Sequence, residues 1–281
     1  MPQLKMLAKT QVECGTLRAQ LTVTEGPRLL MMGVDEENGP KGGYWAIWDK
    51  RTQRSFPSSA TWTAQHLIRV MDNTAPVLLL GLGGAMIPGN LLHGGHNGNV
   101  TAVELCPAVI DLCKAHFLPR IFSQSSAPKA KLLRILHADA GDVASFAPHL
   151  DARPAAVVVD FPPAYVRPRS MPPAFWVQLW KLASPCSQFV INTIFQSAAE
   201  TQLLAAELAA AGWTRISGPI AIANACGHNG TKSAGRCNRI MLAMKGGAWC
   251  TTTSQGGHAV RAQRAVGHRR DMSWDIRPRV A

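Results

Sequence analysis

A glycine-rich segment, Gly81-Leu82-Gly83-Gly84-Ala85, is the most informative chemical feature of the sequence. It follows a continuous apolar run, and Glu104 ends the next apolar segment about 20 positions later. Glycines at such a turn let a ligand approach the backbone, and the carboxylate is placed to accept hydrogen bonds from both ribose hydroxyls. A full G-x-G-x-x-G pattern would need glycine at Met86, so the segment favours a nucleoside without a pyrophosphate. The alternative is a tight turn with Glu104 as a capping or solvated residue.

Two aspartates follow later apolar segments. Asp139, in His-Ala-Asp-Ala, is a short carboxylate that can accept a hydrogen bond from the exocyclic amine of adenine. Asp160, in VVVDFPPAY, comes where ligands of open α/β sheets bind, and there it can take a proton from an attacking amine as general base. Both aspartates can instead cap the turn or helix that follows them.

Alternating elements must position these residues. Continuous apolar runs predict buried parallel strands with helices between them, whereas the last two strands have no helix between them, which predicts an antiparallel end to the sheet. We therefore expect an α/β fold: a seven-stranded Rossmann-like methyltransferase sheet with an antiparallel last strand, preceded by a small β-rich leader. The expected strands are 16–23, 27–34 and 44–48 in the leader and 77–82, 100–104, 132–136, 155–160, 188–194, 213–223 and 238–244 in the sheet; the expected helices are 61–71, 86–93, 107–117, 142–147, 173–183 and 198–211.

Composition and charge set the broad class. The 281 residues are 47% apolar and 16% charged, which is sufficient for a buried core and excludes wholesale disorder. The net charge is +12; residues 245–281 hold 7 of 29 Lys and Arg and 2 of 17 Asp and Glu, or +5, which leaves +7 on residues 1–244. This basic tail predicts an anionic partner, such as RNA or an acidic protein surface, and disfavours a polycationic substrate. A simply solvated basic surface is the other interpretation.

We predict three segments: a leader at 1–60, the main domain at 61–245 and the basic tail at 246–281. Seven cysteines form an odd number without a C-x-x-C motif, which predicts reduced thiols and an intracellular location. That location is cytoplasmic, or organellar if the N-terminus is a processed presequence. The longest apolar stretch is interrupted by glycines, so no membrane span is expected.

Several segments resemble successive motifs of spermidine synthase-like proteins, a branch of the class I S-adenosylmethionine-dependent transferases. They are LLLGLGGAMIPGNLL, VTAVELCPAVIDLCKAHF, LHADAGD, AAVVVDF and NRIMLA, and RPRSMPPAFWVQLWKLAS is similar to a segment of methyltransferases that modify elongation factor 1-alpha. The resemblance covers about residues 16–244.

The resemblance implies a cofactor, S-adenosylmethionine or its decarboxylated form. It implies that Gly81, Gly83 and Gly84 pack against this cofactor, that Glu104 binds its ribose and Asp139 its adenine, and that Asp160 faces the reacting centre. It also implies a homodimer joined through the leader, although this leader is short.

Departures from the family pattern separate three functions. Aminopropyltransferases carry a second acidic residue three positions after the catalytic aspartate, where this chain has Pro163, and their tyrosine-rich pocket is missing from a chain whose only tyrosines are Tyr44 and Tyr165. Methyl transfer to an amine, on a protein for example, is therefore favoured over aminopropyl transfer to a polyamine. A non-catalytic scaffold subunit is the third alternative, supported by Pro163, by Ala85 at a position that is usually glycine and by the basic tail.

Two weaker patterns carry no function of their own. Cys226, His228 and Cys237 share a loop, but no fourth ligand is near and the spacing fits no usual zinc site, so no metal is predicted. Trp176 and Trp180 are four residues apart on an expected helix, which favours core packing over a substrate wall.

Overall fold

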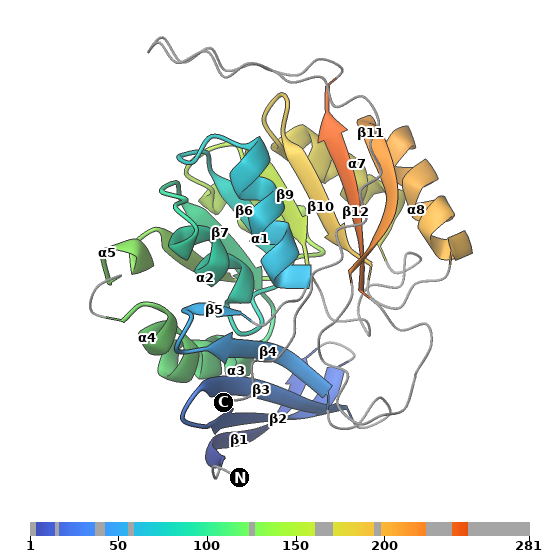
Figure 1. The fold of residues 1–281 in the computed structure, drawn as a ribbon. Helices are drawn as coiled ribbons and strands as arrows, with labels where there is room; N and C mark the ends of the chain where they lie inside the picture. Colours follow the sequence, from blue (N-terminus) through green and yellow to red (C-terminus); the bar gives the residue numbers. More distant parts are fainter. Residues whose placement is uncertain are drawn as a thin grey trace, which may run out of the picture. The chain divides into compact units, whose positions relative to one another are not determined.

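The computed structural model describes residues 4–14, 17–36, 43–55, 59–123, 127–160, 171–193, 198–222 and 238–246. These residues form two β-sheets and the helices around the larger one (Figure 1). The predicted tail after Gly246, the Pro162-Pro163 loop and the loop with Cys226, His228 and Cys237 lie outside the described residues.

The leader is a five-stranded antiparallel sheet in chain order. Its strands are β1 (Lys5–Cys14), β2 (Leu17–Glu25), β3 (Leu29–Glu36), β4 (Gly43–Asp49) and β5 (Arg54–Ser55). The sequence predicted β2, β3 and β4 but not β1, in which Val12 is the one fully buried residue, so that its apolar pattern is weak. Strand β1 forms because each residue pair from Lys5↔Glu25 to Cys14↔Leu17 extends the ladder of β2, with one irregularity.

The second sheet confirms the predicted fold class. Its strands are β6 (Val77–Leu80), β7 (Val100–Glu104), β8 (Leu133–His137), β9 (Ala156–Val159), β10 (Gln188–Asn192), β11 (Trp213–Ile222) and β12 (Asn238–Lys245). They lie in the order β11-β12-β10-β9-β6-β7-β8, and β12 runs antiparallel to both of its neighbours, whereas β10, β9, β6, β7 and β8 are parallel. The chain moves outward from β6 to β8 and then crosses back to β9, so the direction of winding reverses between β6 and β9.

Helices cover both faces of this sheet, because alternate residues of each buried strand point to opposite sides. Leu79, Val158 and Ile240 belong to one apolar cluster, and Leu80, Val159 and Met241 belong to the other. The helices are α1 (Ser59–Val70), α2 (Met86–His93), α3 (Pro107–Leu112), α4 (Leu118–Ile121), α5 (Ala127–Ala130), α6 (Val143–Phe146), α7 (Pro173–Leu182) and α8 (Ala198–Ala210), with a π-helical turn at Cys113–Phe117 and a 3₁₀ turn at Ala147–His149.

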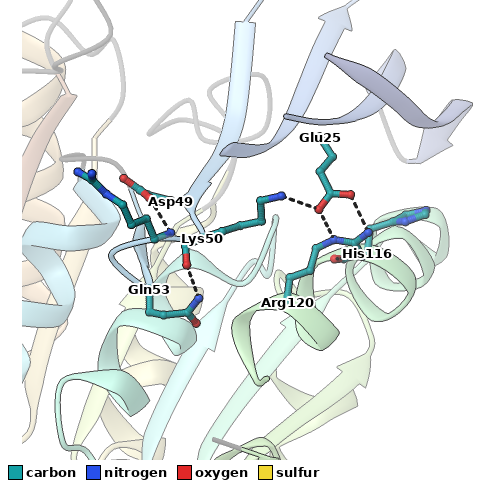
Figure 2. A network of polar contacts seen from close by, with 7 residues as sticks. Glu25, Asp49, Lys50, Gln53, His116 and Arg120 are labelled. Atoms are coloured by element: carbon teal, nitrogen blue, oxygen red, sulfur yellow. Dashed lines mark hydrogen bonds and ion pairs between the residues drawn. The ribbon is translucent and has the colours of Figure 1, made fainter. Parts of the chain in front are cut away.

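A polar network joins the leader to the helices of the larger sheet (Figure 2). Arg120 donates from Nε and Nη2 to the two carboxylate oxygens of Glu25, both at 2.9 Å, and Lys50 Nζ donates to the same carboxylate at 3.0 Å. The hydrogen bond from Arg120 and the positive charge of Lys50 lower the pKa of Glu25 to about 2, against the effect of partial burial. This network ties β2 to α4, which are 95 residues apart in the chain.

The cysteines correct one prediction. Cys14, Cys106 and Cys113 are reduced thiols, as expected, but Cys186 is disulfide-bonded, so the expectation of reduced thiols is wrong at that position. An odd cysteine count carries no information on which side chains the fold brings together. Within the described ranges, no helix is long and apolar enough to cross a membrane.

Candidate functional site

The predicted site residues meet at one edge of the sheet, at the carboxyl ends of five parallel strands. Taken in spatial order, β10 ends at Asn192, β9 is followed by Asp160, β6 by Gly81, β7 ends at Glu104, and β8 is followed by the turn with Asp139. The register fixes this row, because Leu80 pairs with both Val103 and Val159. Neighbouring strands lie about 4.8 Å apart, so the five ends span roughly 19 Å. The row includes the reversal of winding between β6 and β9, where open α/β sheets bind ligands.

The glycine turn has a backbone that ordinary side chains rarely adopt. Gly81 has φ 97° and Gly83 has φ 51°, both in the left-handed region that glycine occupies at little cost. Ala85 also has a positive φ, 59°, which is a strained conformation for a residue with a Cβ. Among the described residues, none lies within 4 Å of a Cβ built on Gly83, so they leave this side of the turn open.

Gly84 has a different role. A Cβ at this position would collide with the Cβ of Ala46 on β4 and crowd the ring of Phe117. Gly84 therefore lets the leader sheet pack directly against the turn.

Glu104 bridges two turns. Its Oε2 accepts a hydrogen bond from the Leu82 amide at 3.0 Å, in the glycine turn, and its Oε1 accepts from the Cys106 amide at 2.9 Å, before α3. The carboxylate is therefore fixed in orientation by two backbone donors. Because each carboxylate oxygen has two lone pairs, both oxygens keep one for a further donor.

Asp139 lies at the opposite end of the row from Asn192. It is exposed, and its Oδ1 accepts from the Gly141 amide at 2.8 Å in an Asx turn. A Cβ on Gly141 would lie 3.6 Å from Cε of Met171, so an apolar side chain lies close to this turn. A hydrogen-bond acceptor beside an apolar surface is a combination that suits a base such as adenine.

Asp160 lies in a short chain of hydrogen bonds that the sequence did not predict. Asn192 Nδ2 donates to Asp160 Oδ1 at 2.7 Å and to Ser59 Oγ, at the start of α1, at 3.0 Å. Burial raises the pKa of Asp160 above its ordinary range, while the hydrogen bond from Asn192 opposes this shift. The sequence signal for Asn192 was its place at the end of a buried run, QFVIN, which the prediction used only for the strand.

The leader also brings one side chain close to the row of strand ends. Cys14, the last residue of β1, hydrogen-bonds with Cys106. Burial, the contact with Cys106 and the nearby charges of Glu104 and Asp139 raise the pKa of the Cys14 thiol to about 11. No sequence pattern pointed to Cys14, because the strand that carries it was not predicted.

The prediction for Trp176 has a clear outcome. Trp176 is fully buried against Phe175 and Phe189, and its Nε1 donates to Glu207 at 3.1 Å, so core packing is confirmed for this residue. Among the described residues, no group of three or more His, Cys, Asp or Glu side chains could hold a metal ion. A shallow hollow lined by Pro76, Asn99 and Pro154 lies at the amino ends of the strands and includes none of the predicted site residues.

No protein-family model matches the sequence, and no curated protein matches it. Solved structures match the fold. A spermidine synthase in complex with the transition state analogue AdoDATO matches with a TM-score of 0.58 and 13% identity over 88% of this chain and 75% of that chain. A probable spermidine synthase from Corynebacterium glutamicum gives a TM-score of 0.59 and 13% identity over 84% of this chain and 80% of that chain. The glycopeptide N-methyltransferase MtfA gives 0.50 and 15% over 68% and 92%.

The coverage of these matches shows which parts of the fold are shared. Residues 61–281 are less than four fifths of the chain, so a match over 88% includes part of the leader sheet. The match to the N-methyltransferase covers a smaller share of this chain, 68%. The chain thus has the fold of the spermidine synthases, built on a sheet that it shares with a methyltransferase.

Proposed function

We propose that the protein is a transferase that binds S-adenosylmethionine and moves its methyl group to a nitrogen. The observation that carries this proposal is the order of groups along the sheet edge: an exposed acceptor at Asp139, a fixed carboxylate at Glu104, an open glycine turn, and a half-buried carboxylate at Asp160. This order corresponds to adenine, ribose, sulfonium and reacting centre in one ligand.

The residues fit such a ligand. Glu104 keeps a free lone pair on each oxygen for the two ribose hydroxyls, and the absence of a Cβ at Gly83 leaves room beside the turn. Asp139 is exposed and so is accessible to an exocyclic amine. Both acidic residues also stabilise the local turns, which prearranges them for binding.

Bound S-adenosylmethionine supplies a methyl group activated on a sulfonium. The nitrogen of the acceptor forms a bond to this carbon as the carbon–sulfur bond breaks, and the electron pair of that bond stays on sulfur. Asp160 takes the proton that the nitrogen loses, and its raised pKa makes it a stronger base than an ordinary aspartate. Alignment of the reacting groups and exclusion of water supply most of the acceleration in such a displacement.

The leader sheet favours a second candidate, aminopropyl transfer, because the matches to spermidine synthases extend into it. Pro163 in the place of a second acidic residue and the net charge of +12 oppose it, since a polyamine needs carboxylates to hold its ammonium groups. A non-catalytic scaffold is the third candidate.

Thermal-shift titration with three nucleosides separates these candidates. We expect S-adenosylmethionine and S-adenosylhomocysteine to stabilise the full chain and decarboxylated S-adenosylmethionine to have little effect; at a concentration 100 times Kd the gain in stability is about 2.7 kcal/mol. Glu104→Ala removes the ribose acceptor, so it should abolish the shift. Stabilisation by the decarboxylated form alone supports aminopropyl transfer. No shift with any of the three compounds contradicts both enzymatic functions.

A further inference from the structure

Two thiols meet where the leader sheet contacts the segment that leads into α3. Cys14 is the last residue of β1, Cys106 is the residue before α3, and β1 contacts α3. The two side chains hydrogen-bond with each other, and both thiols are reduced. The side chain of Cys106 makes no capping hydrogen bond to α3, so its thiol does not serve as a helix cap. The contact instead joins two segments that are far apart in the chain.

The turn that carries Cys106 also holds the candidate ribose carboxylate. The Cys106 amide donates to Oε1 of Glu104 at 2.9 Å, and Nε2 of His137 lies 3.1 Å from the carbonyl oxygen of Leu105 in the same turn. The sulfur of Cys106 and the amide that orients Glu104 therefore belong to one residue. A new covalent bond at this sulfur acts on the orientation of the carboxylate.

The two thiols differ in accessibility. Cys14 is half-buried, whereas Cys106 is 5% exposed. A small disulfide can therefore reach Cys14 first, and the buried thiol of Cys106 is in contact with the sulfur that has reacted. An accessible thiol beside a second thiol that resolves the mixed disulfide is the arrangement that thiol–disulfide exchange requires.

We propose that Cys14 and Cys106 form a redox-active dithiol site that reacts with a low-molecular-weight disulfide, such as glutathione disulfide, and closes to a disulfide between the leader and the turn before α3. The thiolate of Cys14 attacks one sulfur of the small disulfide and releases one small thiolate. The thiol of Cys106 then loses its proton, attacks the sulfur of Cys14 and releases the second small thiolate. The two protein thiols are oxidised and the small disulfide is reduced to two thiols, which take up the two protons.

Closure of this disulfide should weaken nucleoside binding. A covalent bond holds two sulfurs closer together than a hydrogen bond does, so closure shifts Cys106 and with it the amide that holds Glu104. We expect the affinity for S-adenosylhomocysteine to fall roughly tenfold, as for the loss of one hydrogen bond to a charged group. This consequence rests on the proposed function, whereas the dithiol site does not.

The rate of closure should depend on pH. Burial, the contact with Cys106 and the charges of Glu104 and Asp139 raise the pKa of Cys14 to about 11. Because the thiolate is the nucleophile, closure is slow at neutral pH and becomes about tenfold faster with each unit of pH below that value. The site therefore responds to a lasting change in redox conditions. A rate that does not rise with pH would overturn the assignment of Cys14 as the attacking thiol.

Peptide mapping of the full chain after incubation with glutathione disulfide tests the dithiol site without any nucleoside. Trypsin releases residues 10–18, which contain Cys14, and residues 70–114, which contain Cys106 and Cys113. We expect a disulfide to join these two peptides, at a mass two hydrogens below their sum, and reduced glutathione to separate them again. Cys113→Ser is the matched control, because Cys113 is fully buried in the π-helical turn and the variant should still form the disulfide.

Isothermal titration calorimetry with S-adenosylhomocysteine measures the consequence in the reduced and the oxidised protein. The wild-type chain and Cys113→Ser should lose affinity roughly tenfold on oxidation. Cys14→Ser keeps a side chain that can hydrogen-bond but cannot form the disulfide, so its affinity should be the same in both conditions. This variant retains Cys186, so it also reports any effect of the disulfide at that position. Cys106→Ser serves the same purpose if the Cys14 variant does not fold.

The outcomes separate the inference from the proposed function. If no disulfide joins the two peptides, or if Cys113→Ser abolishes it, the dithiol site is overturned. If the disulfide forms but the affinity for S-adenosylhomocysteine does not change, or changes equally in Cys14→Ser, the effect on Glu104 is overturned. If the reduced wild-type chain does not bind S-adenosylhomocysteine, the proposed function fails, and the peptide map still decides whether the dithiol site exists.

Discussion

We expect Asp160, as the proposed general base, to have opposite effects on catalysis and stability. Its pKa is raised in the folded chain, so the folded state holds this proton more tightly than the unfolded state does. The contribution to the free energy of unfolding is therefore largest below the ordinary pKa of an aspartate, and it falls as the pH rises toward the folded-state value. Above that folded-state value, where the group is ionised, its burial costs stability.

Asp160→Asn should accordingly abolish transfer and increase the free energy of unfolding at neutral pH by about 1 kcal/mol. Its amide oxygen can still accept the hydrogen bond from Asn192, so the contact seen in the structure is retained. Denaturant unfolding at neutral and at acid pH measures the effect, and the gain should shrink at acid pH, where the wild-type carboxyl is protonated. An equal gain at both pH values would contradict the assigned protonation.

Gly84 determines how closely β4 approaches the glycine turn. Gly84→Ala should lower the free energy of unfolding by about 2 kcal/mol, because its new methyl group overlaps with Ala46. The double variant Gly84→Ala/Ala46→Gly should recover most of this loss in a double-mutant cycle.

Gly83→Ala is the control for this cycle. At Gly83 there is open space, so the cost, about 1–2 kcal/mol, comes from its positive φ alone. Ala46→Gly should therefore not rescue Gly83→Ala. Equal rescue of both variants would show that the contact between β4 and the turn is not the cause.

The ion pairs of Glu25 with Lys50 and Arg120 make the free energy of unfolding depend on pH. The pKa of Glu25 is lowered, so its stabilising contribution is present above the ordinary pKa of a glutamate and is lost as the pH falls toward about 2. Glu25→Gln should lower the free energy of unfolding by about 2 kcal/mol at neutral pH and remove this acid-dependent loss. Asp151→Asn, in the more exposed pair with Arg134, should change little. Urea unfolding between neutral pH and pH 3 distinguishes the two.

At the scale of the whole molecule, the net charge divides into +5 on residues 245–281 and +7 on the rest. We expect removal of residues 246–281 to weaken binding to an anionic polymer such as RNA, with a smaller dependence on salt, and to leave nucleoside binding unchanged. Fluorescence anisotropy with a labelled single-stranded RNA and calorimetry with S-adenosylhomocysteine measure the two effects. Loss of nucleoside binding in the truncated chain would mean that the tail belongs to the main domain.

The sequence by itself determined the main sheet, because continuous apolar runs such as Val77–Leu80 have no stable place except between two helical layers. It also placed Gly81, Glu104, Asp139 and Asp160 at one edge, since parallel strands end on the same side. Strand β1 was missed because one fully buried residue gives no periodic signal, and its pairing with β2 is decided by hydrogen bonds between backbones.

Only the tertiary structure decided the partners across that edge. Asn192 and Asp160 are 32 residues apart, and Cys14 is far in sequence from Cys106; no local spacing predicts that either pair meets. The sequence could not predict the disulfide at Cys186 either, because a disulfide bond depends on how close two cysteines lie in space. The spacing of apolar residues is a local property that can be read directly from the sequence. Hydrogen bonds between the ends of strands depend on which strands become neighbours, and only the tertiary structure decides this.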